Sequence, residues 1–324
     1  ILSFRGALLT LRCIACVRAQ LGGAPDVLVV DNHSEDDSLE QLHGAYPGMR
    51  VLALPENAGF AGGMNAGLLQ AIEGRYDYVW LLNNDAFPEP DCLAALVAAM
   101  DGDDRLAAVA PRLLSNDGTE QPAGGLVDWL TGDVTLYAAA ELAQQSTATE
   151  ADGVWVAGTA LLARVDMVAR LDAFEPAFFS YWEDVDWCVR ATRAGARLAA
   201  IPDARALHLG AGTSGMGSPF QHHLQIRNRW LFLQRHSRAA SPRSLWYRYL
   251  AVGLHRAALQ DLRGYPALSA AVLAGMTAAR HGRYFAPPSS YAAGWPERCL
   301  ATAPWRAGRV LIDRKSTRLN SSHR

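Results

Sequence analysis

The apolar segment Tyr78–Leu82 stops abruptly at three polar residues, Asn83, Asn84 and Asp85. Because its apolar residues are continuous rather than alternating, the segment is typical of a strand buried on both faces of a sheet. A carboxylate at the end of such a strand is costly unless a cation, a helix N-terminus or solvent compensates its charge. In open α/β sheets, ligands bind at the carboxyl ends of the strands. Asp85 is therefore a candidate metal ligand, and capping of the helix that follows Pro90 is the alternative.

A second apolar segment, 27–30, also ends in an acid, Asp31. At neighbouring strand ends, Asp31 would suit a base or ribose, and Asp85 would suit a metal-bound diphosphate. Between them, segment 57–67 contains four glycines, which let the backbone approach a ligand closely and begin a helix. The order excludes a dinucleotide-binding fingerprint, in which the glycine turn follows the first strand and the acid comes about 20 residues later.

Strand-like and helix-like segments alternate through the first half of the chain. The expected strands are 1–4, 27–30, 51–54 and 78–82, and the expected helices are 8–20, 38–43, 57–72 and 92–100. Such alternation predicts an α/β fold with a mostly parallel central sheet and helices on both faces. Segment 106–140 has strand and turn signals that suggest a smaller antiparallel element, and from 221 to about 285 the pattern is helical and amphipathic.

The composition is that of a soluble enzyme. The chain has 324 residues, of which 50% are hydrophobic and 19% charged, and its net charge of −2 argues against a general nucleic-acid-binding protein. Cys13 and Cys16 have C-x-x-C spacing, but no second pair or nearby His completes a zinc site. No apolar stretch approaches the length of a membrane span and no signal peptide is visible, so a reduced, cytoplasmic protein is expected.

Three regions are expected along the chain: a catalytic domain over 1–235, a helical C-terminal extension over 236–313, and a tail over 314–324. The chain begins at Ile1, inside an expected strand, so we expect a few residues to precede it. The tail is polar, basic and without periodicity, which indicates a disordered or artefactual segment.

The segment 178–190 places three acids, Glu183, Asp184 and Asp186, at the start of an expected helix, where the helix dipole favours them. Asp186 is spaced to pair with Arg190 along one face, which gives it a structural explanation. Asp184 lies on another side and is preceded by four aromatic residues. A carboxylate beside aromatic surface suits a general base that acts on a sugar hydroxyl.

Taken together, these motifs resemble those of inverting family-2 glycosyltransferases of the GT-A fold, in the rhamnosyltransferase-like branch. They occur in the family's order between residue 1 and about 235. The motifs are segments 29–38, 57–67 and 82–85, Gly158 with Arg164, segment 182–186, and His208 before segment 210–214.

The resemblance implies a role for each matching residue. Asp31 would contact the base or ribose, and the other donor-binding residues would be Ser3, Phe4, Asn57, Gly59, Gly63, Asn65, Asn84 and Arg227. Asp184 would be the catalytic base, with Trp182 and Glu183 on the acceptor side. Asp85 matches the last acid of the family's D-x-D motif and would bind Mg²⁺ or Mn²⁺ together with His208. By itself, a lone His after an apolar strand, such as His208, is more often structural, and Arg227 is equally well explained as part of a basic helix face.

The implied reaction moves a sugar from a nucleotide-sugar donor to a hydroxyl of a glycan or lipid-linked acceptor in envelope glycan assembly. dTDP-rhamnose is the first expectation for the donor, and UDP-galactofuranose or another UDP-sugar is the alternative. A sugar nucleotidyltransferase would need a basic glycine-rich loop after the first strand, where the chain has Arg5 and Gly6. An inactive nucleotide-sugar-binding domain would be expected to lack Asp85 or Asp184.

The amphipathic segment 244–284 combines apolar and aromatic residues with arginines. Such helices can lie in a membrane interface, which would place the enzyme on the cytoplasmic face of the membrane. The alternative is that the apolar side packs on the catalytic domain. The sequence does not indicate an oligomeric state.

Overall fold

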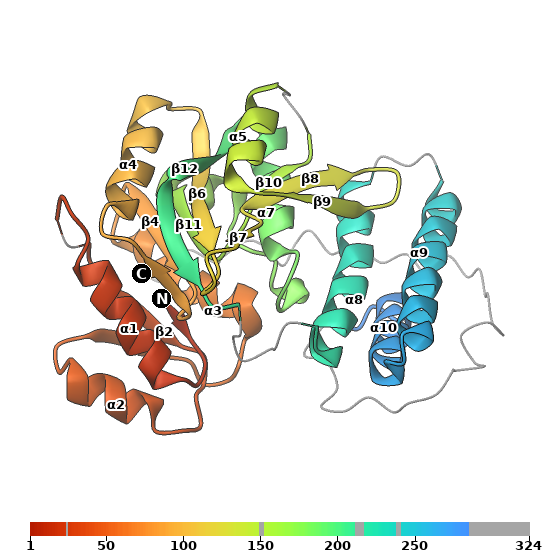
Figure 1. Ribbon diagram of the computed structural model, residues 1–324, viewed down its shortest axis with the longest axis horizontal. Helices are drawn as coiled ribbons and strands as arrows, with labels where there is room; N and C mark the ends of the chain where they lie inside the picture. Colours follow the sequence, from red (N-terminus) through yellow and green to blue (C-terminus); the bar gives the residue numbers. More distant parts are fainter. Residues whose placement is uncertain (24, 149–151, 211–216, 238–240, 285–324) are drawn as a thin grey trace, which may run out of the picture. The chain divides into compact units, whose positions relative to one another are not determined.

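Strands and helices alternate through the N-terminal part, as the hydrophobic pattern predicts (Figure 1). The computed structural model describes residues 1–23, 25–148, 152–210, 217–237 and 241–284. The first elements are β1 (Leu2–Ser3), α1 (Ala7–Arg18), β2 (Leu28–Asp31), α2 (Ser38–Ala45), β3 (Arg50–Ala53), α3 (Gly59–Glu73), β4 (Tyr78–Leu82), β5 (Ala86–Pro88) and α4 (Cys92–Gly102). All lie within about two residues of their expected positions, except β5, which was not expected.

The later elements include the acid-rich helix and the C-terminal helices. They are β6 (Leu106–Leu114), β7 (Glu120–Gln121), β8 (Gly124–Asp128), β9 (Asp133–Tyr137), α5 (Ala139–Ala148), β10 (Val154–Val156), β11 (Ala160–Arg164), α6 (Val165–Leu171), the 3-10 turn Pro176–Phe178, α7 (Glu183–Arg193), β12 (Arg197–His208), α8 (Pro219–His236), α9 (Pro242–Leu262) and α10 (Pro266–Arg280). The expected tail, 314–324, lies outside the described residues.

The central sheet is mixed rather than mostly parallel. β1, β2 and β3 are parallel, and a bridge between Leu2 and Asn83 connects β1 to the end of β4. The remaining order is β4-β11-β6-β12-β5, in which β11 is antiparallel to both neighbours and β5 is antiparallel to β12. The expected parallel pairing is found in β1 to β3 and in the β6–β12 pair, whereas β11 and β5, for which no strand was expected, are antiparallel to their neighbours. A short buried apolar run reads the same in either direction, so its sequence does not report strand polarity.

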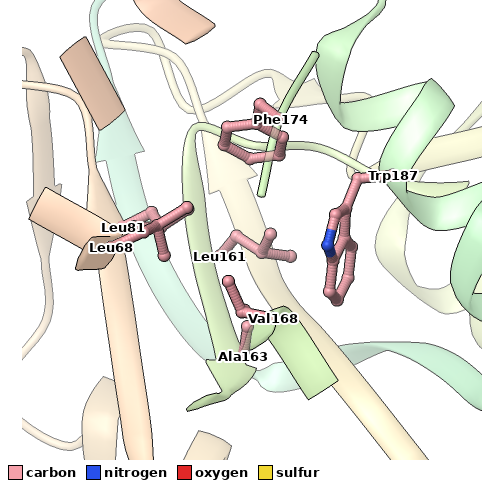
Figure 2. Close-up of a pocket in the computed structure, with 7 residues that line it drawn as sticks. All are labelled: Leu68, Leu81, Leu161, Ala163, Val168, Phe174 and Trp187. Carbon is pink, nitrogen blue, oxygen red and sulfur yellow. The ribbon is translucent and has the colours of Figure 1, made fainter. Parts of the chain in front are cut away.

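Helices cover both faces of the sheet because alternate residues of each strand point to opposite sides. Val29 packs with Ile14 of α1 and Leu42 of α2, whereas its neighbour Val30 packs with Met64 of α3. Figure 2 shows the core on the α3 side, where side chains from two strands, three helices and the loop after α6 converge on a void of about 10 Å³. They are Leu68, Leu81, Leu161, Ala163, Val168, Phe174 and Trp187. Trp187 belongs to α7, so this packing fixes the acid-rich helix against the sheet.

The small antiparallel element expected within 106–140 is confirmed. β8 pairs with β9 on one side and β10 on the other, both antiparallel. The strands approach closely at Gly125, where a Cβ atom would lie 1.9 Å from the carbonyl oxygen of Thr135. A side chain at this position would therefore force the hairpin apart.

The C-terminal helices α8, α9 and α10 share an apolar core. Its buried residues include Trp230 of α8, Leu245 and Tyr249 of α9, and Leu273 and Met276 of α10. The apolar side of α9 thus packs on neighbouring helices, as one of the two expectations states. None of the helices among the described residues is both long and apolar enough to cross a bilayer.

The buried carboxylate of Asp186 links α7 to α8. Its Oδ1 accepts hydrogen bonds from His236 Nε2 at 2.7 Å and Arg235 Nε at 2.8 Å, and its Oδ2 accepts one from Arg190 Nε at 2.9 Å. Burial alone would raise the pKa of Asp186. The hydrogen bond from His236 and the charges of Arg190 and Arg235 outweigh burial and lower it to about 2. The sequence predicts the ion pair between Asp186 and Arg190. It does not predict the contacts of Asp186 with Arg235 and His236 of α8.

We expect Asp186→Asn to lower the free energy of unfolding at neutral pH by roughly 3–5 kcal/mol, because it leaves buried cations without their partner. Since the folded-state pKa is lowered, this contribution is present above the ordinary value of 3.8 and is lost as the pH falls toward about 2. Urea unfolding measures it, with the exposed Glu73→Gln as control. Equal stability of the two variants would contradict this role of Asp186.

Candidate functional site

A cleft of about 680 Å³ opens at the carboxyl end of β4. Ligand pockets generally measure about 300–1,000 Å³. One wall contains Phe4, segment 57–60 and segment 83–85, and the other contains β9, the start of α7 and the start of α8. The cleft therefore joins the nucleotide-binding half expected from the sequence to the acid-rich helix.

Asp85 and His208 meet at one corner of this cleft. β12 runs antiparallel to β5 with His208 opposite Ala86, so the two side chains come from adjacent strand ends. Asp85 is 3% exposed, and its Oδ1 lies 3.5 Å from His208 Nε2. Asn83 contributes a buried Oδ1 for which the described residues provide no hydrogen-bond partner.

These groups fit a divalent cation. A carboxylate, an imidazole nitrogen and an unsatisfied amide oxygen belong to residues that line the cleft, and no Lys or Arg of the described residues forms an ion pair with Asp85. In that same part of the chain, no third His, Cys, Asp or Glu completes a metal cluster. Mg²⁺ usually takes one or two carboxylates plus substrate phosphates. A cation here would therefore depend on phosphate oxygens of a bound ligand.

Asp184 lies at the first turn of α7 and lines the cleft. Its Oδ2 accepts a hydrogen bond from Gly158 N at 3.0 Å, and its Oδ1 accepts one from Val185 N at 2.8 Å. A Cβ atom at Gly158 would lie 3.3 Å from the Cβ of Asp184, so a glycine there leaves room for the carboxylate. Burial raises the pKa of Asp184 although both N–H groups oppose it. A carboxylate with raised proton affinity suits a general base.

Glu183 is a second buried acid beside Asp184. Its Oε2 is without a hydrogen-bond partner within the described part of the chain. Burial raises the pKa of Glu183 well above its ordinary value, and the neighbouring Asp184 raises it further. Glu183 and Trp182 both line the cleft, so their expected acceptor-side roles stay predictions that the geometry permits.

The loop before α7 has strained backbone. Phe179, Tyr181 and Trp182 have positive φ angles of 63°, 68° and 77°. Such conformations cost on the order of 1–3 kcal/mol each and persist where the surroundings hold them. Here Asn228 of α8 holds them, since its Nδ2 lies 2.7 to 2.8 Å from the carbonyl oxygens of Phe178, Ser180 and Tyr181.

The structure gives Arg227 a supporting position, and its expected donor-binding role stays a prediction. Arg227 is 0% exposed and does not line the cleft. Its Nη2 donates to the carbonyl of Phe178 at 2.8 Å, and its Nε donates to Asn228 Oδ1 at 2.8 Å. Arg227 therefore supports the strained loop from behind, because a guanidinium can satisfy several carbonyl groups at once.

Of the other expected donor-binding residues, four line the cleft: Phe4, Asn57, Gly59 and Asn84. Gly59 has a φ of +71°, and a Cβ there would lie 2.3 Å from the carbonyl oxygen of Phe179. This glycine therefore allows the loop before α7 to approach α3. Contacts of these four residues with a donor stay predictions.

Ser3, Gly63 and Asn65 lie outside the cleft lining, and their expected donor-binding roles stay predictions. Ser3 Oγ pairs with Thr10 at 2.9 Å beneath the strand end. Gly63 leaves room for the side chain of Leu2, because a Cβ atom at Gly63 would lie 2.5 Å from Cδ1 of Leu2. Asn65 exchanges two hydrogen bonds with the backbone of Phe174. In each case the residue makes a contact inside the protein, whereas the resemblance implies a contact with the donor.

Asp31 is also buried, but one of its oxygens is unused. Its Oδ2 accepts a hydrogen bond from Ser34 N at 3.0 Å, whereas its Oδ1 finds no partner among the residues described. It is not part of the cleft lining. The contact between Asp31 and a nucleotide base or ribose therefore stays a prediction.

Two family models match the chain. The one described as "Glycosyl transferase family 2" covers residues 2–137, and the one described as "Glycosyl transferase family group 2" covers residues 78–281, more than half of the chain. The chain belongs to glycosyl transferase family 2. It is therefore a glycosyltransferase that depends on a nucleotide-sugar donor.

Relatives and solved structures agree with this assignment. The chain is 26% identical over 231 residues to an N-acetylglucosaminyl-diphospho-decaprenol L-rhamnosyltransferase of Mycobacterium tuberculosis, which is 65% of this chain and 75% of that protein. It matches mannosyltransferase PcManGT from Pyrobaculum calidifontis in complex with GDP-Man and Mn²⁺, with a TM-score of 0.55, 16% identity, and coverage of 87% and 86%. It also matches GalNAc-T7 with UDP, GalNAc and Mn²⁺, with a TM-score of 0.57, 13% identity, and coverage of 89% and 57%. These likenesses confirm the GT-A-like α/β fold.

The glycosyltransferase cleft also contains residues that the sequence did not single out. Gln121, Trp155, Phe220 and Gln225 line it, from β7, β10 and α8. Each is a lone residue in an ordinary strand or helix pattern. The sequence carries no signal that separates them from residues outside the site.

We expect the stability of this glycosyltransferase to fall with rising pH because of Glu183. Its folded-state pKa is raised, so its contribution is complete below the ordinary value of 4.5 and is lost as the pH rises through the raised value. The glutamine of Glu183→Gln cannot ionise. As the pH rises, the free energy of unfolding of this variant should therefore fall less than that of the wild type. Urea unfolding from about pH 5 to about pH 8 compares the two. Parallel stability curves would contradict the raised pKa.

Proposed function

We propose that this glycosyltransferase transfers its sugar with inversion to a hydroxyl of a glycan or lipid-linked acceptor, with Asp184 as the general base. One observation carries the proposal: a single cleft contains both Asp184 and the Asp85–His208 pair. A base and a cation-binding corner in one cleft are what a single displacement from a nucleoside diphosphate needs.

In the proposed reaction, Asp184 takes the proton of the acceptor hydroxyl. The hydroxyl oxygen forms a bond to the anomeric carbon, and the bond from that carbon to the diphosphate oxygen breaks. Its electron pair leaves with the nucleoside diphosphate, and attack on the opposite face inverts the configuration. The raised pKa of Asp184 favours this role, because a base works best when its pKa approaches the working pH.

Asp85 and His208, with Asn83 beside them, would hold Mg²⁺ or Mn²⁺ at the donor diphosphate. When bound, such a cation neutralises the charge that develops on the leaving group. The solved structures with Mn²⁺ and nucleotides described above support this choice of ion.

For the donor we propose dTDP-rhamnose, with UDP-galactofuranose or another UDP-sugar as the alternative. The rhamnosyltransferase relative supports rhamnose. Its name also supports a lipid-linked acceptor, because it acts on a diphospho-decaprenol. Val134, Leu136 and Trp155 give the acceptor side of the cleft an apolar lining that suits such a molecule.

We expect Asp184→Asn to bind the donor nearly as well as the wild type and to turn over at least about 10²-fold more slowly, as is typical when a general base is lost. Release of nucleoside diphosphate measures turnover, and titration calorimetry measures donor binding. The exposed Asp172→Asn is the control. Turnover within a few-fold of the wild type in Asp184→Asn would remove Asp184 from its proposed role.

The same release assay, run with a panel of donors, identifies the sugar nucleotide. We expect dTDP-rhamnose to give the highest kcat/KM. A higher kcat/KM with a UDP-sugar would replace rhamnose by that sugar and leave the role of Asp184 intact.

We also propose that the turn between α9 and α10 touches the membrane that carries a lipid-linked acceptor. Leu262 and Tyr265 are 85% and 56% exposed at this turn, and Arg263 between them is exposed as well. Exposed apolar and aromatic side chains beside a cation suit an anionic membrane interface. The division into a catalytic domain over 1–235 and an extension over 236–313 is part of this proposal.

We expect the enzyme to sediment with anionic vesicles at low salt and less at high salt, because salt screens the attraction of arginines to lipid head groups. Leu262→Asp should reduce binding. Leu8→Asp, at an exposed leucine of α1, should bind like the wild type. Failure of the wild type to bind at low salt would show that α9 and α10 serve only as packing elements.

A further inference from the structure

Gln121 contacts the imidazole of His208 on the side away from Asp85. Gln121 Oε1 lies 2.7 Å from His208 Nδ1. The other ring nitrogen, Nε2, lies 3.5 Å from Oδ1 of Asp85. The ring is therefore held between an amide and a carboxylate, and all three residues line the cleft.

The amide of Gln121 can point in only one direction. Its Nε2 donates to the carbonyl oxygen of His208 at 2.8 Å and to Ser115 Oγ at 2.8 Å. A carbonyl oxygen can only accept, so this end of the amide must be the NH₂ group. The end that faces His208 Nδ1 is therefore the oxygen, which is an acceptor.

An acceptor at this distance requires the proton of a neutral imidazole to be on Nδ1. In that tautomer Nε2 has no proton and keeps its lone pair. Nε2 is the nitrogen that faces Asp85. Two electron-rich atoms then face each other, and a cation bound to both is stabilising.

We propose that Gln121 is a positioning residue that holds neutral His208 in the Nδ1–H tautomer, so that Nε2 and Asp85 are ready to bind a divalent cation. Histidines that bind metals commonly donate their other N–H to an oxygen in this way. The inference rests on the proposed function, because the cation concerned is the one at the donor diphosphate.

The backbone places Gln121 independently of any ligand. β7 pairs antiparallel with the end of β6, with Gln121 opposite Leu113. The connecting turn is closed by Ser115 N donating to Thr119 O at 2.8 Å and by Gly118, which has a φ of +80°. This short hairpin carries Gln121 to the end of β12, where His208 lies.

The test measures Mn²⁺ affinity from the EPR signal of free Mn²⁺, in the presence of UDP and, separately, of dTDP. We expect Gln121→Met to bind Mn²⁺ about 10–100-fold more weakly, the usual effect of removing such a partner. Gln121→Glu keeps an acceptor for Nδ1–H and should stay within about threefold of the wild type. Wild-type affinity in Gln121→Met would overturn the proposal, as would equal losses in both variants, since equal losses assign the effect to the bond to the His208 carbonyl.

Ser115→Ala is the matched control, because it removes the other partner of the Gln121 amide and leaves the contact with His208. We expect its Mn²⁺ affinity to equal that of the wild type. A loss as large as that of Gln121→Met would assign the effect to the hairpin and overturn the role in the tautomer.

A second measurement needs no variant. Long-range ¹H–¹⁵N NMR spectra of the metal-free wild type at about pH 8, where imidazole is neutral, report which nitrogen of His208 carries the proton. We expect Nδ1. A proton on Nε2 would overturn the proposal whatever the variants do.

Asp85→Ala separates this inference from the proposed metal site. If Asp85→Ala lowers Mn²⁺ affinity and Gln121→Met does not, the metal site stands and the role of Gln121 fails. If Asp85→Ala binds Mn²⁺ like the wild type, the metal site itself fails, and the role of Gln121 fails with it.

Discussion

The catalytic half of the molecule depends on one compensated buried charge, the carboxylate of Asp186. It ties the first turn of α7 to Arg235 and His236 of α8, and separating the two helices would leave buried charges without partners. Two residues earlier, Asp184 has no such cationic partners among the described residues, and its pKa is raised by burial, whereas that of Asp186 is lowered to about 2. The same turn of helix thus carries a structural acid, Asp186, and the proposed general base, Asp184, which lie on different sides of the helix.

The second consequence of this link is that α8 takes part in building the cleft. Asn228 and Arg227 of α8 bind the carbonyl groups of the loop that precedes α7, where three residues adopt positive φ angles. The strain is tolerable because the buried carbonyl groups of the loop are satisfied. The loop in turn lies against Gly59 of α3. The start of α3 and the loop before α7 therefore meet through close backbone packing.

The sequence by itself determined the alternation of strands and helices, the family, and three residues that line the cleft. The apolar run before Asn83 required a buried strand. The charge of Asp85 at the end of that strand required compensation in any fold that contains such a strand. Asp85, His208 and Asp184 do line one cleft, as the ordered motifs imply. Hydrophobic periodicity reports burial strongly, so element positions were predicted to within about two residues over the first half.

Only the tertiary structure decided strand polarity and which polar residues face the cleft. β11 reads as an apolar run in either direction, so its antiparallel pairing is invisible in the sequence. Asn65 and Arg227 bond to backbone groups, although the same side chains would also suit a donor. In the sequence Gln121 is an ordinary strand residue. Its partner His208 lies 87 positions later, and only the folding of β12 brings the two together. The type of a residue determines which hydrogen bonds it can make. The folded chain determines which partner lies within reach.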